Sequence, residues 1–216
     1  MDAQEREGNV RATNGKIFPP LLNAVLFLVL AGGAAQAQSA TDWQDGSLID
    51  EVRVGVLAHD VKFAGGRERG EDISAELLFA SPFPLDWGDS LPEWLKWVAR
   101  PRPQIGGDLN TAGATSQIYG GLNWTVPLAP RVLFDNDHLT LDLDFGPSVN
   151  NGHVNRTVPD RKALGSQALF RLAAELGWHF TPRLAVYLLF EHVSNSDLAT
   201  YNQSLNDVGV RVGYRF

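Results

Sequence analysis

The chain has 216 residues, of which 44% are hydrophobic and 20% charged, a composition that excludes wholesale disorder and favours one folded domain. Its formal net charge of -7 gives no basic footprint for nucleic acid, and the absence of cysteine excludes disulfides, zinc–thiolate sites and cysteine nucleophiles. The sequence has no clustered ligand spacing and no phosphate-binding glycine loop, so we expect neither a metal nor a cofactor.

The N-terminal segment has the three regions of a secretory signal. Lys16 precedes an apolar run at 21–30, and small residues follow up to Ala35-Gln36-Ala37, which fits the small-x-small cleavage rule. The run is shorter than the roughly 20 residues that a spanning helix needs. We therefore expect a cleaved signal peptide at 1–37 and one exported domain at 38–216. An N-terminal membrane anchor is the alternative, and the long, mixed-charge leader leaves the true start codon and the cleavage site open.

The rest of the chain reads as strands separated by turn signals. Eight segments are expected, an even number as in single-chain outer-membrane barrels of bacteria: 51–59, 71–80, 102–110, 115–126, 138–148, 164–180, 183–194 and 206–216. The segment 81–100 fits less well because it is rich in Trp and Pro. Within it, 91–98 is expected either as a short amphipathic helix at the lipid–water interface or as part of a long turn packed under the barrel mouth.

The last strand shows the clearest alternation. Its two faces, which point to opposite sides of a sheet, are Val208, Val210, Val212, Tyr214 and Phe216, and Asp207, Gly209, Arg211, Gly213 and Arg215. In a small membrane barrel the apolar face meets lipid and the charged face fills the lumen. There Arg171 and Arg211 are expected to be neutralised by acids such as Glu175 and Asp142.

The chain also ends on an aromatic residue, which resembles the C-terminal signal that the barrel-assembly machinery recognises, so Phe216 is the expected contact to that machinery. We predict an all-β fold, an eight-stranded antiparallel outer-membrane β-barrel in a Gram-negative bacterium. A soluble half-buried sheet would alternate in a similar way, so a soluble periplasmic lipid-binding barrel is an alternative.

Topology places one constellation at the membrane surface. With both termini in the periplasm, the seventh strand runs outward, and its end at 191–195 lies on the outer-leaflet side. Strand parity puts His192 and Ser194 on the same face as Leu188 and Phe190, the face expected to meet lipid. Polar side chains there are costly without a function. A His that acts as general base on a Ser nucleophile carries out acyl transfer.

A third member is sought across the hairpin. If Leu184 lies opposite Tyr214, then His192 lies opposite Asn206, whose side-chain oxygen can orient the imidazole. Asp207 has the wrong parity unless a bulge turns it outward. Asn195 and nearby loop amides are candidate oxyanion donors.

At this point a family resemblance becomes specific. The stretch His-Val-Ser-Asn-Ser-Asp-Leu from His192, Asn202 and the Tyr-Arg-Phe end resemble the lipid A 3-O-deacylase (PagL) family. Upstream, two segments look like members described as acyloxyacyl hydrolases: Arg53-Val54-Gly55-Val56 with Ala58-His59-Asp60, and Asp160-Arg161-Lys162-Ala163-Leu164-Gly165-Ser166. The resemblance covers most of 38–216.

The resemblance implies an esterase that removes the 3-O-linked acyl chain of lipid A in lipopolysaccharide. It implies His192 as base, Ser194 as nucleophile and the Asn195 side chain in the oxyanion hole. Two departures concern the rate: Asn206 replaces the family's orienting Glu, and Asp197 stands where a small residue is common.

Asn can hold a His tautomer but supplies no full charge. The alternative function is a non-catalytic barrel with a structural or adhesion role, in which Ser194 is merely a strand-end residue ahead of an Asn-rich turn. The sequence decides neither the acyl position and chain length that are preferred nor whether the barrel forms a homodimer.

Overall fold

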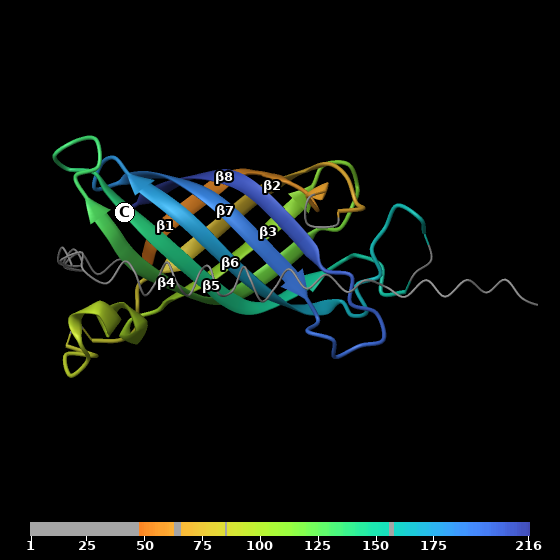
Figure 1. Cartoon of the computed structure of the whole chain (residues 1–216), viewed down its shortest axis with the longest axis horizontal. Coiled ribbons are helices and arrows are strands. Elements are labelled where there is room, and N and C mark those ends of the chain that lie inside the picture. The colour runs from red at the N-terminus through yellow and green to blue at the C-terminus, as the bar shows by residue number, and fades with distance from the viewer. Residues whose placement is uncertain (1–47, 63–65, 85, 156–157) are drawn as a thin grey trace, which may run out of the picture.

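The barrel is closed by hydrogen bonds between every pair of neighbouring strands, including the first and the last (Figure 1). The computed structural model describes residues 48–62, 66–84, 86–155 and 158–216, so the expected signal peptide at 1–37 lies outside the described residues. The elements are β1 (Ile49–Ala58), β2 (Glu71–Phe79), the 3₁₀ helix η2 (Glu93–Ala99), β3 (Arg102–Asn110), β4 (Gln117–Pro130), β5 (His138–Asn150), β6 (Ala168–His179), β7 (Leu184–Ser194) and β8 (Leu205–Arg215). The predicted eight-stranded antiparallel barrel is confirmed.

Two strand boundaries differ from the expected ones, each for a local reason. The strand expected at 164–180 begins only at Ala168, because Leu164 and Gly165 donate their backbone N–H groups to the carbonyls of His153 and Val154 within the preceding loop. The strand expected to end at Val126 continues to Pro130. A register shift between Pro127 and Ala129 accommodates the proline, which has no N–H to give to the ladder.

The barrel is polar inside and apolar outside. Three arginines, Arg53, Arg171 and Arg211, are among the most buried side chains of the described residues. The outward face instead exposes aliphatic side chains, including Val54, Val56, Ile73, Ile105, Leu188, Val210 and Val212. A soluble lipid carrier would have an apolar interior, so this inverse pattern is that of a barrel whose outer face meets hydrocarbon.

Ion pairs between the strands hold the charged lumen together. Arg211 contacts Glu175 at 3.1 Å, and Arg53 pairs with Asp142 and stacks 3.9 Å from the ring centroid of Tyr187. The expected neutralisation of arginines by acids is therefore observed. Because each guanidinium is shared by several strands, these ion pairs resist separation of the barrel wall as well as neutralising charge.

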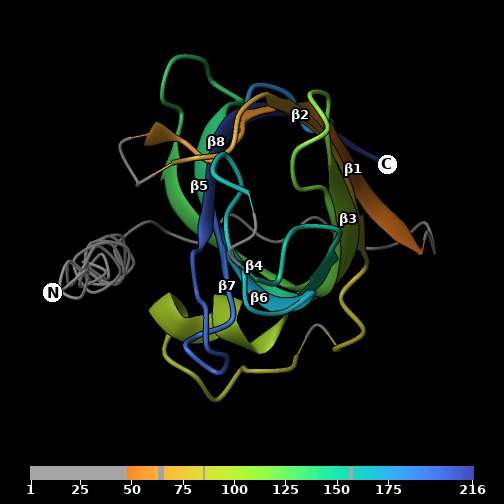
Figure 2. The same cartoon turned by 90° about the vertical axis from the view of Figure 1, so that its right-hand side faces the viewer.

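The two ends of the barrel differ. The C-terminus, the β4–β5 and β6–β7 turns and the segment with η2 lie at one end, and the longer loops that follow β1, β5 and β7 lie at the other (Figure 1). Viewed from the latter end, called the outer mouth here, η2 lies outside the ring of strands (Figure 2). It has no buried residue, and Trp124 of β4 donates to the Val98 carbonyl at 3.1 Å.

The short helix expected near 91–98 is thus confirmed as a 3₁₀ helix, and its position outside the wall excludes a turn packed under the mouth. No helix of the described residues has the length and hydrophobicity needed to cross a bilayer.

Candidate active site

Two of the predicted site residues meet across the β7–β8 hairpin. His192 is registered opposite Asn206, and Leu184 opposite Tyr214, as expected. The imidazole Nδ1 lies 2.8 Å from the Asn206 side-chain oxygen Oδ1. Because an amide oxygen can only accept a hydrogen bond, Nδ1 carries the proton, and the neutral ring then has its lone pair on Nε2. This is the tautomer that a general base requires.

Ser194 is the last residue of β7 and shares the outward parity of His192. Both side chains are half-buried, and Ser194 is registered opposite Phe170 of β6. Among the described residues, no hydrogen bond joins the Ser194 hydroxyl to the imidazole. Residues i and i+2 on one face of a strand are neighbours, and catalytic hydrogen bonds are often long before substrate binds.

The loop after Ser194 begins with a tight turn of unusual backbone. Ser196 and Asp197 have φ values of 55° and 62°, and Leu198 donates to the Asn195 carbonyl at 3.1 Å. Two consecutive non-glycine residues at positive φ are strained, and such strain is concentrated at functional sites. The backbone N–H groups of Ser196 and Asp197 have no hydrogen-bond partner within the part of the chain that the structure describes.

Asn202 braces this turn from the other side of the loop. It accepts from the backbone N–H of Asn195 at 3.1 Å and donates to the Asp197 carboxylate at 2.8 Å. The carboxylate that departs from the family pattern is therefore tied to an amide. The sequence pattern includes Asn202 but predicts no role for it, because its position eight residues after Ser194 gives no periodic signal.

Asn195 points away from the outward face. Its side chain is 3% exposed, and Nδ2 donates to the carbonyls of Leu164 and Tyr201 at 2.7 and 2.6 Å. Both amide hydrogens are thereby used. The structure brings His192 and Asn206 together, keeps Ser194 beside them, and directs the Asn195 amide to the base of the loop.

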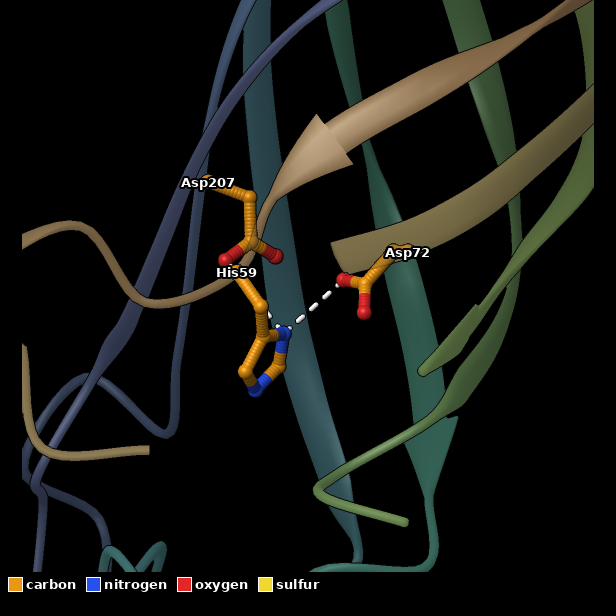
Figure 3. Close-up of side chains that lie close together, drawn as sticks. All are labelled: His59, Asp72 and Asp207. Atoms are coloured by element: carbon orange, nitrogen blue, oxygen red, sulfur yellow. Dashed lines mark hydrogen bonds and ion pairs between the residues drawn. The ribbon is translucent and has the colours of Figure 1, made fainter. Parts of the chain in front are cut away.

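Behind the hairpin, on the lumen side, lies a buried charge cluster that the sequence did not predict (Figure 3). His59 Nδ1 lies 2.8 Å from Asp72 and 3.6 Å from Asp207, and Nε2 lies 3.3 Å from Glu68. Asp207 is registered opposite Glu191 without a bulge. It therefore faces the lumen and does not replace Asn206 as a partner of His192.

The pKa of His59 indicates which charge this side chain carries in the cluster. Burial opposes the charge of His59, but the hydrogen bonds to Asp72 and Glu68 and the charge of Asp207 outweigh it and raise the pKa of His59 to about 10. His59, Asp72 and Asp207 have the spacing of metal ligands. An imidazolium, however, has no lone pair to offer a metal. The His59 side chain is buried among carboxylates from two strands, β2 and β8, and from the β1–β2 loop.

These features define a class of protein: a β-barrel with an apolar outer surface, a charged lumen and a His–Asn pair beside a Ser on the outward face. The family model for lipid A 3-O-deacylase (PagL) matches residues 83–215. The chain belongs to this family, whose members are lipid A hydrolases of the outer membrane.

One solved structure supports the fold. The crystal structure of the outer membrane enzyme PagL has 16% identity to this chain and a TM-score of 0.52, and the match covers 77% of this chain and 99% of the other. The Yersinia pestis outer membrane protein Ail matches with 13% identity and a TM-score of 0.39, covering 79% of this chain and 100% of that one. Among curated protein sequences, none matches the chain.

Proposed function

We propose that the protein hydrolyses the ester at the 3 position of lipid A, with Ser194 as nucleophile and His192 as general base. The observation that carries this proposal is the contact of 2.8 Å between His192 Nδ1 and Asn206 Oδ1 on the outward face of the barrel. This contact supports the proposal because it favours the basic tautomer of His192, near the end of the barrel where we expect an outer-leaflet lipid.

The chemistry follows the usual course of acyl transfer. The Ser194 oxygen attacks the ester carbonyl while His192 Nε2 takes the hydroxyl proton. The tetrahedral intermediate then collapses, the bond to the sugar oxygen breaks, and that oxygen receives the proton from the imidazolium. Water attacks the acyl-enzyme in the same way and releases a fatty acid and free Ser194. A closed hairpin on a rigid barrel suits this reaction because its parts need little movement.

The oxyanion donors in this proposal are the backbone N–H groups of Ser196 and Asp197, which their positive φ values leave outside the hairpin ladder. Asn195 joins them only in a conformation in which Nδ2 leaves one of its two carbonyl partners. Asn202 draws the Asp197 carboxylate into a hydrogen bond, which moderates its repulsion of a developing oxyanion.

One observation favours the alternative, a non-catalytic barrel with a structural or adhesion role. Asn206 stands where the family has a carboxylate, so the imidazolium formed in the reaction has no full negative charge beside it. An enzyme built in this way is expected to be slower than its relatives.

Reaction with a serine-reactive phosphonate ester distinguishes an esterase from a non-catalytic barrel. We expect the intact barrel to gain one phosphonyl mass at Ser194. The adduct should be absent in Ser194→Ala and strongly slowed in His192→Ala. Ser196→Ala is the matched control, since it removes a nearby hydroxyl but keeps the backbone N–H. Labelling of Ser194→Ala as fast as the wild type would contradict the assignment of the nucleophile.

A further inference from the structure

The β7–β8 loop, which carries the turn at Ser196–Asp197, is braced by a segment that is distant in sequence. This segment is residues 161–165 of the β5–β6 loop. Gln203 N donates to the Ala163 carbonyl at 3.0 Å, and Ala163 N donates to the Gln203 side chain at 2.9 Å. Asn195 Nδ2 donates to the Leu164 carbonyl. The β7–β8 loop is therefore held at both ends by a neighbouring loop as well as by its own strands.

The approach of the two segments is very close at Gly165. This residue has a φ of +77°, and a Cβ added there would lie 1.8 Å from the Tyr201 carbonyl oxygen and 2.5 Å from Asn195 Nδ2. Beside it, Leu164 packs with Leu169, Val193 and Leu205 in a buried cluster. Val193 lies between the candidate base and nucleophile in sequence, so the same segment supports the hairpin from the lumen side.

Lys162 connects this brace to a third loop. Its side chain is 6% exposed, and Nζ lies 2.6 Å from the Asp60 carboxylate oxygen Oδ1 and 2.5 Å from the Ser204 carbonyl. Ser204 lies two residues before Asn206. The Lys162 backbone N–H donates to Glu68 at 2.9 Å. One residue thus links the β1–β2, β5–β6 and β7–β8 loops.

The Asp60 end of this link is itself fixed. Its second oxygen accepts the N–H groups of Arg67 and Glu68 at 2.6 and 3.0 Å, and its own N–H donates to Asp207 at 2.6 Å. A buried ion pair is a weak source of net stability, since desolvation of both charges offsets their attraction. The Lys162–Asp60 ion pair is therefore better explained by the arrangement of the loops that it holds in place.

We propose that Lys162 is a positioning residue for the active site: by holding the Ser204 carbonyl against Asp60, it fixes the β7–β8 loop and with it the turn at Ser196–Asp197 and the place of Asn206. This inference rests on the proposed function for its effect on catalysis. It makes a separate claim about the order of the loop that does not depend on any activity.

Lys162→Met tests the proposal because it keeps the length of the side chain and removes the charge and its donors. The matched control is Lys96→Met, which removes a lysine from η2 at the opposite end of the barrel, where Lys96 pairs with exposed Glu93. We expect kcat on lipid A to fall at least tenfold in Lys162→Met, with KM changed less than threefold, and neither to change in Lys96→Met.

Hydrogen–deuterium exchange of the folded barrel in nanodiscs gives the second readout. We expect the amides of 196–204 to exchange at least tenfold faster in Lys162→Met, with those of β7 and of β8 beyond Asn206 unchanged. If Lys162→Met does not fold, Asp60→Asn serves in its place, with the same pattern in weaker form.

Unchanged exchange and unchanged kcat in a folded variant would overturn the proposal, as would a loss confined to KM. If the wild type has no deacylase activity, the proposed function fails and exchange alone decides. Faster exchange at 196–204 in Lys162→Met but not in Lys96→Met would then still support the positioning role, and equal exchange would overturn it.

Discussion

Asn206 is the residue at which a small change should raise activity. Asn206→Asp keeps the size of the side chain and an oxygen within reach of His192 Nδ1, now 2.8 Å from Asn206 Oδ1, and adds a full negative charge. Two unit charges about 4 Å apart interact by about 4 kcal/mol at an effective dielectric constant of about 20. Asn206 is only 6% exposed, so desolvation of the new carboxylate offsets part of this gain.

We expect a net stabilisation of the imidazolium-like transition state of about 1.5 to 3 kcal/mol, which is roughly a 10- to 100-fold increase in kcat. The assay is release of fatty acid from lipid A by the reconstituted barrel, with the fold checked by circular dichroism. Asn206→Leu is the control that removes the acceptor and should lower kcat. A folded Asn206→Asp variant with kcat equal to or below that of the wild type would refute the reasoning that Asn206 occupies the position of the orienting acid.

Three further predictions concern stability. Arg53→Met removes one of the cations that neutralise Glu51, Asp142 and Glu175 in the lumen, so urea unfolding in bilayers should show a loss of about 3 to 5 kcal/mol, against no resolvable change for exposed Arg183→Met. Leu188→Arg puts a charge on the lipid-facing side of β7 and should cost about 2 to 4 kcal/mol in the same assay, whereas a cost near zero would contradict the outward face. The pKa of His59 is about 10 in the folded barrel and 6.5 in the unfolded chain. Protonated His59 therefore stabilises the outer mouth by at most about 5 kcal/mol below pH 6.5, and this stabilisation is lost as the pH rises to 10. Protease sensitivity of the β1–β2 loop should therefore increase over that window, and this dependence should disappear in His59→Gln.

The strands were predictable because alternation is a local property. The register of β7 and β8 follows from pairing one apolar face with another, and it places His192 opposite Asn206. The predicted contact needs only strand parity and the pairing of Leu184 with Tyr214.

The parts that sequence reasoning missed depend on contacts between loops. Leu164 has the parity of the apolar face of β6, yet the chain at 163–165 hydrogen-bonds within its own loop and to the β7–β8 loop, and the positive φ of Gly165 allows that approach. The burial of His59 depends on acids brought in from other strands, so its own neighbours in sequence do not reveal it. Strand parity places the Asn195 side chain on the lumen side, and its contacts with the Leu164 and Tyr201 carbonyls depend on segments that approach it only in the fold.

The most direct test of the central claim is mass spectrometry of lipid A from Gram-negative cells that express the protein, with Ser194→Ala and His192→Ala as paired controls. We expect lipid A to lose the mass of one hydroxyacyl chain, and either substitution to abolish the loss while the barrel still reaches the outer membrane. Unchanged lipid A in cells whose outer membrane contains the folded wild-type barrel would contradict the account and favour a non-catalytic barrel.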